Sequence, residues 1–244
     1  MSAGARVSAH TQRPRSDAVA MPARGLLVRG RRTSRWLIRR RYDVRVHHPE
    51  RFPAHGAAVV AGNHIGLIDG PLMAIFAPRP VHALTKVEMF SGPLGPFLRA
   101  SGQIPLDRDH TDPAAVRIAL RVLREGHAVG VFPEGTRGPG DLERFHGGAA
   151  YLALVTGAPV VPLTFLGSRE PGGSSSSLPR KGARIDLVVG EPYAVDAAPW
   201  PRTRENVRLT SAALRSHLQQ QLAEALDETG RRLPGPLPQG ERDE

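Results

Sequence analysis

The 244-residue chain contains no cysteine, and only two of its 33 basic residues are lysines, Lys86 and Lys181. The lack of cysteine excludes disulfide bonds, thiolate nucleophiles and metal sites built on thiolates. Long apolar runs are also missing, because polar residues and a proline interrupt the most apolar stretch, residues 57–77. No membrane-spanning helix is expected, since a span needs about 20 nearly uninterrupted apolar residues. No apolar segment follows the arginines at 39–41, which argues against an export signal.

Acidic residues are scarce near the N-terminus, and this explains the net charge of +10. Residues 1–46 hold twelve arginines against Asp17 and Asp43, whereas the rest of the chain is electrically neutral. A basic arm of this kind suits nucleic acid or an anionic membrane surface. The neutral remainder carries no nucleic-acid recognition motif, so we expect no nucleic-acid partner.

The pattern of residues 25–41 predicts a basic amphipathic helix. Leu26, Leu27, Leu37 and Ile38 fall on one arc of the helix, and arginines cover most of the other side. Trp36 lies outside that arc. Two interpretations stay open: the helix lies in a bilayer interface, or it packs its apolar stripe on its own domain and leaves the arginines solvated.

The composition divides the chain into three segments. Residues 1–46 are expected to form a basic extension with the amphipathic helix, disordered up to residue 24. Residues 47–229 are expected to form one domain, followed by a disordered tail at 230–244 that is rich in proline and glycine. Inside the domain, the serine-rich residues 167–183 are predicted to form a flexible surface loop.

Apolar runs alternate with helical patterns along the predicted domain. Strands are predicted at 57–61, 81–85, 102–106, 128–132, 160–166 and 184–189. Helices are predicted at 71–76, 113–124, 148–156 and 204–229, with Thr111 or Asp112 capping the second of them. The alternation predicts an α/β fold with a central, mostly parallel or mixed sheet flanked by helices.

His64 and Asp69 follow the first predicted strand. In open α/β sheets, functional sites gather at strand ends. A histidine can remove a proton from a hydroxyl as that oxygen attacks a carbonyl, and a carboxylate on its other nitrogen improves this base. The spacing suits a histidine on a loop and an aspartate at the start of the next helix. The alternative is a structural histidine and a helix-capping aspartate.

A second polar group, residues 132–137, follows the predicted strand at 128–132. Gly135 allows a ligand to approach the backbone closely. Thr136 offers a hydroxyl, and Arg137 offers a planar fork suited to phosphate. Glu134 can accept hydrogen bonds from polyol hydroxyls. The alternative is a charged turn closed by a Glu–Arg pair.

Arg108 and Lys86 each come directly after another predicted strand. Arg108 can therefore reach the same sheet edge and add a second phosphate donor. The alternative for Arg108 is a surface ion pair with Asp107 or Asp109, which contributes little to stability. Lys86 would add positive charge to the same site.

In this order along the chain, these elements resemble the glycerolipid acyltransferase family, which includes the lysophosphatidic acid acyltransferases. The resemblance covers about residues 47–195. The matching positions are His64 with Asp69, Arg108 in a second block, residues 132–137, and residues 160–163 in a proline-containing fourth block. Gly66 departs from the pattern, because many members carry serine there.

The resemblance implies a mechanism and a set of partners. His64 would deprotonate the acceptor hydroxyl, Asp69 would orient the ring, and the hydroxyl would attack an acyl thioester without a covalent acyl-enzyme. The residues implied for binding the glycerol phosphate are Arg108, Glu134, Gly135, Thr136 and Arg137. The implied partners are acyl-CoA or acyl carrier protein as donor, an acceptor of the lysophosphatidic acid type, and anionic lipids at the cytoplasmic face of the membrane, where the protein would be peripheral. No metal or other cofactor is expected.

One alternative belongs to another functional class, and one is a rival enzyme. A noncatalytic lipid- or acyl-carrier-binding protein on the same fold would not need the His64–Asp69 pair. A condensation-type acyltransferase uses the pattern His-x-x-x-Asp-Gly. Here Asp69 and Gly70 follow His64 with one residue too many, and the chain is too short for a two-lobed architecture.

Overall fold

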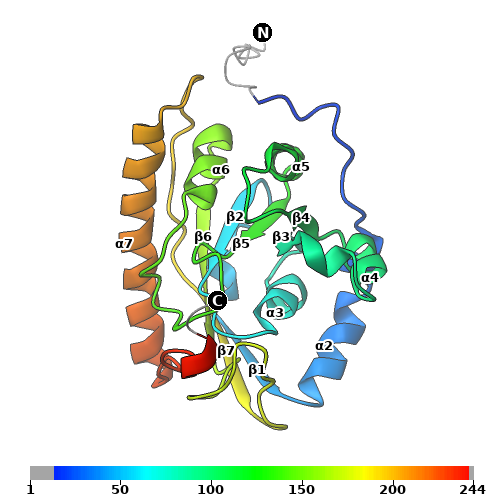
Figure 1. The fold of residues 1–244 in the computed structure, drawn as a ribbon, viewed down its shortest axis with the longest axis vertical. Coiled ribbons are helices and arrows are strands. Elements are labelled where there is room, and N and C mark those ends of the chain that lie inside the picture. Colours follow the sequence, from blue (N-terminus) through cyan, green and yellow to red (C-terminus); the bar gives the residue numbers. More distant parts are fainter. Residues whose placement is uncertain (1–13, 242–244) are drawn as a thin grey trace.

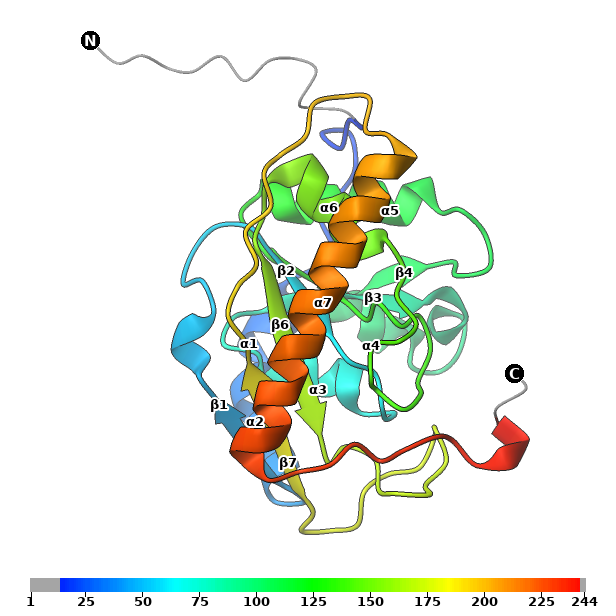
Figure 2. The same cartoon turned by 90° about the vertical axis from the view of Figure 1, so that its left-hand side faces the viewer.

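The computed structural model describes residues 14–241, in which seven strands form one sheet with helices on both faces (Figures 1 and 2). Along the sheet, the strands are β1 (Asp43–His47), β7 (Arg184–Val189), β6 (Val160–Leu166), β2 (Ala58–Gly62), β5 (Ala128–Val131), β3 (Val81–Lys86) and β4 (Ile104–Leu106). Neighbouring strands pair in parallel, except that β6 and β7 are antiparallel. The predicted α/β fold with a mostly parallel sheet is confirmed.

The helices alternate with the strands along the chain. They are α1 (Gly25–Arg29), α2 (Arg31–Arg39), α3 (Asp69–Phe76), α4 (Gly95–Ala100), α5 (Pro113–Arg124), α6 (Gly148–Thr156) and α7 (Arg204–Thr229), with 3-10 turns η1 (Pro49–Arg51), η2 (Val87–Phe90) and η3 (Gln239–Glu241). The predicted cap of α5 is Asp112, whose side chain accepts from the amides of Ala114 and Ala115 at 3.0 and 2.9 Å.

The central strands are apolar along their length because both faces of the sheet are covered. Successive residues of β2 point to opposite faces. Val59 and Ala61 belong to the core shared with α5, α6 and α7, whereas Ala58 and Val60 belong to the core shared with α3. Figure 2 shows α7 running diagonally across the first of these faces.

Strand β1 is an edge strand that the sequence analysis does not predict. Charged residues alternate with valines in it, and of its five residues only Val44 is buried. β1 pairs with β7 alone, so it runs opposite to β2, β3, β5 and β6. The short helix α4 is likewise absent from the prediction.

The predicted N-terminal helix is two helices, α1 and α2, which meet at Gly30, and a glycine inside a helix weakens it. Arg31 and Arg35 both donate to the backbone carbonyls of Ile75 and Ala77, at the end of α3. Burial lowers the pKa of Arg31 to about 10. Arginines of α2 therefore face the protein, while Trp36 and Leu37 are exposed. Of the predicted apolar stripe, Leu27 is buried and Ile38 packs against the core, whereas Leu26 is exposed like Leu37, so its own domain covers only half of the stripe.

Both ends predicted to be disordered have a defined course within the described residues. Arg124 of α5 donates to the carbonyl of Pro14 at 2.9 Å and to the Ser16 hydroxyl at 2.6 Å. At the other end, the carbonyl of Gly235 accepts from Arg169 at 2.6 Å. Paired backbone groups fix segments that composition alone marks as unstructured. Residues 1–13 and 242–244 lie outside the described residues, and the division into three segments stays a prediction.

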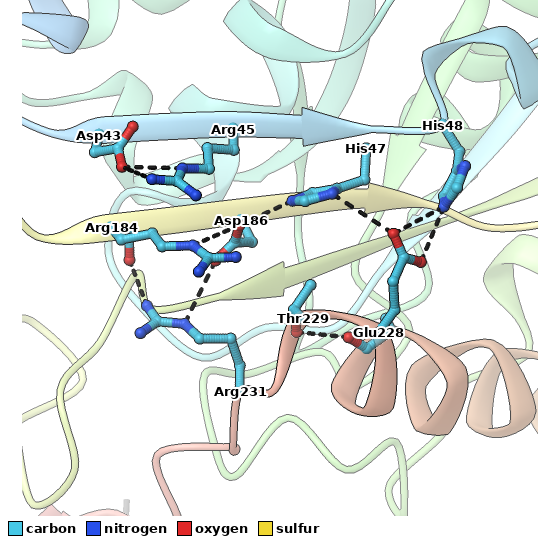
Figure 3. A network of polar contacts seen from close by, with 10 residues as sticks. Asp43, Arg45, His47, His48, Arg184, Asp186, Glu228, Thr229 and Arg231 are labelled. Atoms are coloured by element: carbon cyan, nitrogen blue, oxygen red, sulfur yellow. Dashed lines mark hydrogen bonds and ion pairs between the residues drawn. The ribbon is translucent and has the colours of Figure 1, made fainter.

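A network of charged side chains attaches the end of α7 to the β1–β7 edge (Figure 3). Asp186 of β7 is fully buried and lies 2.8 Å from Nε2 of His47, 2.9 Å from Nε of Arg184 and 3.4 Å from Nε of Arg231. Glu228 near the end of α7 reaches His48 at 2.9 Å. The network therefore holds α7 and the start of the tail against the sheet.

Within residues 14–241, no helix combines the length and the apolar character needed to cross a membrane.

Candidate active site

His64 and Asp69 lie together where β2 ends and α3 begins, as predicted. Nδ1 of His64 is 3.0 Å from Oδ2 of Asp69. The imidazole stacks on the ring of Phe132, which follows β5, with 4.1 Å between centroids and 19° between planes. The side chain of His64 is 18% exposed. With Nδ1 bound to the carboxylate, Nε2 is the nitrogen available to take a proton from a substrate.

Asp69 is fully buried and surrounded by hydrogen-bond donors. Its Oδ2 atom accepts from the amides of Ile65 and Gly66 at 2.7 and 2.8 Å, in addition to His64. Its Oδ1 atom accepts from the hydroxyl of Ser168. Asp69 is therefore held in one orientation, with its charge directed at His64.

Glu134 lies beneath the His64 loop instead of facing solvent, and it is 3% exposed. Its Oε1 atom accepts from the amide of His64 at 2.8 Å, and its carboxylate also receives the amide of Gly140. The amide of Gly138 in turn donates to the carbonyl of His64 at 2.8 Å. Burial raises the pKa of Glu134 to about 8. The carboxyl of Glu134 therefore has two backbone partners, and it joins the loop of His64 after β2 to the loop that follows β5.

Arg108 comes to the same loop from the end of β4, because its guanidinium donates to the carbonyl of Gly135. Gly135 has a φ of 74°, and a Cβ atom there would lie 2.8 Å from the ring of His146. Glycine is therefore required at this position on two counts. Thr136 is exposed beside it.

Arg137 and Lys86 lie on different sides of the loop that follows β5, Arg137 toward the serine-rich loop and Lys86 toward η2. Arg137 donates to the carbonyl of Ser175 at 2.9 Å, in the serine-rich loop. Lys86 is exposed and pairs with Glu88 at 3.2 Å. The pKa of Glu88 is lowered first by its own backbone amide, and Lys86 and Arg108 both contribute. Lys86 pairs in register with Leu106 of β4, two residues before Arg108, so Lys86 and Arg108 lie on the same side of the site.

Ser168 and Arg169 are functional candidates that the sequence analysis missed. Both are buried, although they fall in the segment predicted to be a flexible surface loop. Besides Gly235, Arg169 donates to the carbonyl of Ile65 at 2.7 Å and to that of Gly138 at 3.0 Å, so it also joins the loop after β2 to the loop after β5. The signal was their position directly after β6, because the site is built from strand ends.

Gly66 shows how closely the end of β6 approaches the His64 loop. A Cβ atom at Gly66 would lie 2.5 Å from the carbonyl oxygen of Ser168. A serine could enter here only if the backbone moved. The departure from the family pattern at Gly66 therefore matches the tight packing around Ser168 and Asp69.

Comparison with known proteins agrees with this geometry. The acyltransferase family model matches residues 43–166. A 1-acyl-sn-glycerol-3-phosphate acyltransferase of Bacillus subtilis is 31% identical over 175 residues, which cover 70% of this chain and 85% of the relative. A human 1-acyl-sn-glycerol-3-phosphate acyltransferase beta is 32% identical over 130 residues, covering 51% of this chain and 46% of the relative.

A solved structure agrees as well. The crystal structure of the 1-acyl-sn-glycerophosphate (LPA) acyltransferase PlsC from Thermotoga maritima superimposes with a TM-score of 0.56 at 26% identity, covering 82% of this chain and 76% of that one. The family match, the relatives and the shared fold coincide with a His–Asp pair whose second nitrogen is open. The chain therefore belongs to the acyltransferase family, as a member similar to the 1-acyl-sn-glycerol-3-phosphate acyltransferases.

Proposed function

We propose that this acyltransferase moves a fatty acyl group from an acyl thioester to the free hydroxyl of lysophosphatidic acid. The observation that carries the proposal is the His64–Asp69 pair, in which Nε2 of His64 has no hydrogen-bond partner among residues 14–241, together with two arginines at the neighbouring loop. The relative from Bacillus subtilis is named for the same reaction. The donor is acyl-CoA or acylated acyl carrier protein.

The transfer takes place in one exchange at the thioester carbonyl. Nε2 of His64 removes the hydroxyl proton while that oxygen attacks the carbonyl carbon, and Asp69 stabilises the imidazolium that forms. The new C–O bond replaces the C–S bond, and the imidazolium returns the proton to the departing thiolate. No covalent acyl-enzyme is needed, so the lack of cysteine is no obstacle.

The phosphate of the acceptor binds at the loop that follows β5. Arg137 and Arg108 supply guanidinium donors, and Lys86 adds charge. Thr136 supplies a hydroxyl, and Gly135 lets the phosphate approach the backbone. Glu134 acts from below by holding the amide of His64.

The enzyme acts as a peripheral protein on anionic lipids at the cytoplasmic face of the membrane. Support comes from α2, which turns Trp36 and Leu37 outward and exposes Arg32 and Arg39, while Arg31 and Arg35 bond to the end of α3. Each arginine near an anionic leaflet contributes about 1 kcal/mol to binding. A lysophosphatidic acid acceptor is amphipathic and resides at the membrane surface, so an enzyme bound to that surface has direct access to it.

The test is thioester turnover by the purified protein with acyl-CoA or acyl carrier protein as donor. The acceptors are lysophosphatidic acid, glycerol 3-phosphate and a lysophospholipid with a larger head group. We expect thiol release that depends on lysophosphatidic acid and disappears in His64→Ala. Arg137→Ala should raise KM for phosphorylated acceptors. Absence of turnover with every pair of donor and acceptor would instead favour a noncatalytic lipid-binding protein.

A further inference from the structure

Exposed apolar side chains are concentrated on one part of the molecule. Of the twelve large apolar side chains that are exposed within residues 14–241, seven lie on α1, α2, η2 and α4, and an eighth, Leu94, directly precedes α4. They are Leu26, Val28, Trp36, Leu37, Val87, Met89, Leu94 and Phe97. Helix α1 packs against both α2 and α4, and α4 packs against η2. The four residues on and between η2 and α4 (Val87, Met89, Leu94 and Phe97) are named the α4 patch below.

The α4 patch is held firmly in its outward orientation. A Cβ atom at Gly95 would collide with the carbonyl of Phe90, so α4 begins in direct contact with the η2 backbone. The same carbonyl accepts from Arg99 at 2.8 Å, and that guanidinium lies 5.9 Å from the centre of the Phe90 ring. Leu94 and Phe97, three residues apart, share one helical face and are more than half exposed. An ordered helix that presents such a face to water indicates a partner.

The α4 patch adjoins the proposed phosphate site. Turn η2 starts directly after Lys86, and Glu88 within it pairs with Lys86 at 3.2 Å. The charge of Arg108 reaches the same carboxylate. Arg108 in turn donates to the carbonyl of Gly135. A surface that covers the α4 patch would therefore lie beside the entrance used by the acceptor.

The charges around this surface select the kind of partner. No acidic residue occurs between Asp17 and Asp43, and exposed arginines on α1 and α2 are Arg29, Arg32 and Arg39, with Arg40 directly after α2. Arg99 is exposed on α4, and Lys86 compensates the one carboxylate of η2, Glu88. An apolar surface edged by arginine matches a partner with an apolar interior and a negative face, which describes an anionic bilayer.

We propose that the α4 patch is a second membrane contact, which inserts Leu94 and Phe97 into the bilayer interface next to α2. Figure 1 shows α2 and α4 on the same side of the sheet, the side away from α7. One amphipathic helix leaves the body free to rotate about it, whereas two contacts fix its orientation. The Arg108 side of the active site then faces the lipid surface. The inference rests on the membrane association in the proposed function.

The absence of cysteine allows a direct test with one dye per molecule. Phe97→Cys and Leu209→Cys, each labelled with an environment-sensitive dye, are mixed with phosphatidylglycerol–phosphatidylcholine vesicles. The two positions are matched, since Phe97 is 54% and Leu209 is 55% exposed, and Leu209 lies on α7. The dye at 97 should brighten and shift to the blue, while the dye at 209 stays unchanged. An unchanged signal at 97 in protein that sediments with the vesicles would overturn the proposal.

Serine variants measure the contribution to binding. Leu94→Ser with Phe97→Ser should weaken partitioning onto the same vesicles by about tenfold or more. Leu209→Ser should bind like the wild type, and turnover of a short-chain, water-soluble acceptor should be unchanged in all variants. Equal weakening by Leu209→Ser would overturn the proposal. So would loss of self-association with unchanged vesicle binding, which would assign the patch to a second copy of the chain. Vesicle binding is read without turnover, so failure of the proposed reaction is seen separately.

Discussion

Among residues 14–241, two histidine–aspartate pairs look alike by distance and burial. In the first, Nδ1 of His64 lies 3.0 Å from Asp69. In the second, Nε2 of His47 lies 2.8 Å from Asp186 (Figure 3). Both aspartates are fully buried, and the histidine side chains are 18% and 24% exposed. Neither quantity tells which pair performs chemistry.

The surroundings of the two pairs differ. The groups that donate hydrogen bonds to Asp69 are neutral apart from the imidazolium that His64 would form, although the charge of buried Arg169 also acts on Asp69. Asp186 is already matched by Arg184 and Arg231. The second nitrogen of His47 lies 3.6 Å from Glu228, whereas that of His64 has no hydrogen-bond partner within the described part of the chain. Because two arginines already neutralise the charge of Asp186, it stabilises an imidazolium on His47 less than Asp69 stabilises one on His64.

The topology explains the difference. His64 follows β2 at the edge where the carboxyl ends of five parallel strands meet. His47 ends β1, which runs the opposite way, so it lies at the other edge of the sheet. In open α/β sheets the carboxyl edge carries the chemistry. The pair at the other edge fastens α7 and the tail to the sheet.

The largest contrast is expected when each histidine is removed. His64→Ala should lower kcat by about 10²- to 10⁴-fold, because the proton acceptor is lost. His47→Ala should leave kcat unchanged and lower the free energy of unfolding by about 1–3 kcal/mol, since its hydrogen bond to buried Asp186 is lost. Turnover assays and urea unfolding separate the two effects. A loss of kcat in His47→Ala as large as that in His64→Ala would contradict the assignment of catalysis to the His64–Asp69 pair alone.

The aspartates should show the same contrast at a smaller scale. Asp69→Asn should lower kcat by about 10²-fold or more, because His64 would lose the charged partner that stabilises its imidazolium. Asp186→Asn should retain kcat and lose about 3 kcal/mol of stability, since Arg184 and Arg231 would share no carboxylate. Limited proteolysis of the tail after Gly230 would report the second effect. Retention of full kcat in Asp69→Asn would contradict the assignment.

Much of this contrast could be predicted from the sequence, but not all of it. His64, Asp69 and Arg108 were placed at one sheet edge because apolar runs marked the strands that precede them. Strand β1 could not be predicted because only two of its residues are apolar. The His47–Asp186 pair, which depends on β1, could therefore not be predicted either. Ser168 and Arg169 were missed because serine and glycine dominate the following segment. Their role depends on the register of β6 against β2, a long-range pairing that local composition does not encode.

Ser168 sharpens the comparison, because it belongs to the first pair alone. Ser168→Ala should lower kcat by about 10- to 100-fold with little change in KM, since Asp69 loses a buried donor and part of its orientation. In an Asp69→Asn background the same change should have little further effect. Ser177→Ala is the control, because its hydroxyl donates to the Ser174 carbonyl of the same loop and not to the catalytic pair. Full additivity with Asp69→Asn would show that Ser168 acts on something else.

His64 and His47 each have a glutamate nearby, Glu134 and Glu228. These two glutamates should differ in how they make the free energy of unfolding depend on pH. Glu134 is buried under His64, and burial raises its pKa from 4.5 to about 8. Glu228 beside His47 is 41% exposed. Between pH 5 and 8 the folded protein keeps a proton on Glu134 that the unfolded chain releases. The stability from this proton is therefore full below about pH 4.5 and lost as pH rises through about 8.

The smallest expected effect, counted per pH unit, follows from the raised pKa of Glu134. The free energy of unfolding of the wild type should fall by about 1 kcal/mol per pH unit between pH 5 and 8 relative to Glu134→Gln, which cannot release the proton. Urea unfolding at several pH values measures this difference. Glu228→Gln removes an exposed carboxylate and should keep the wild-type slope. Equal slopes in wild type and Glu134→Gln would mean that Glu134 is ionised in the fold, with its negative charge held by the amides of His64 and Gly140.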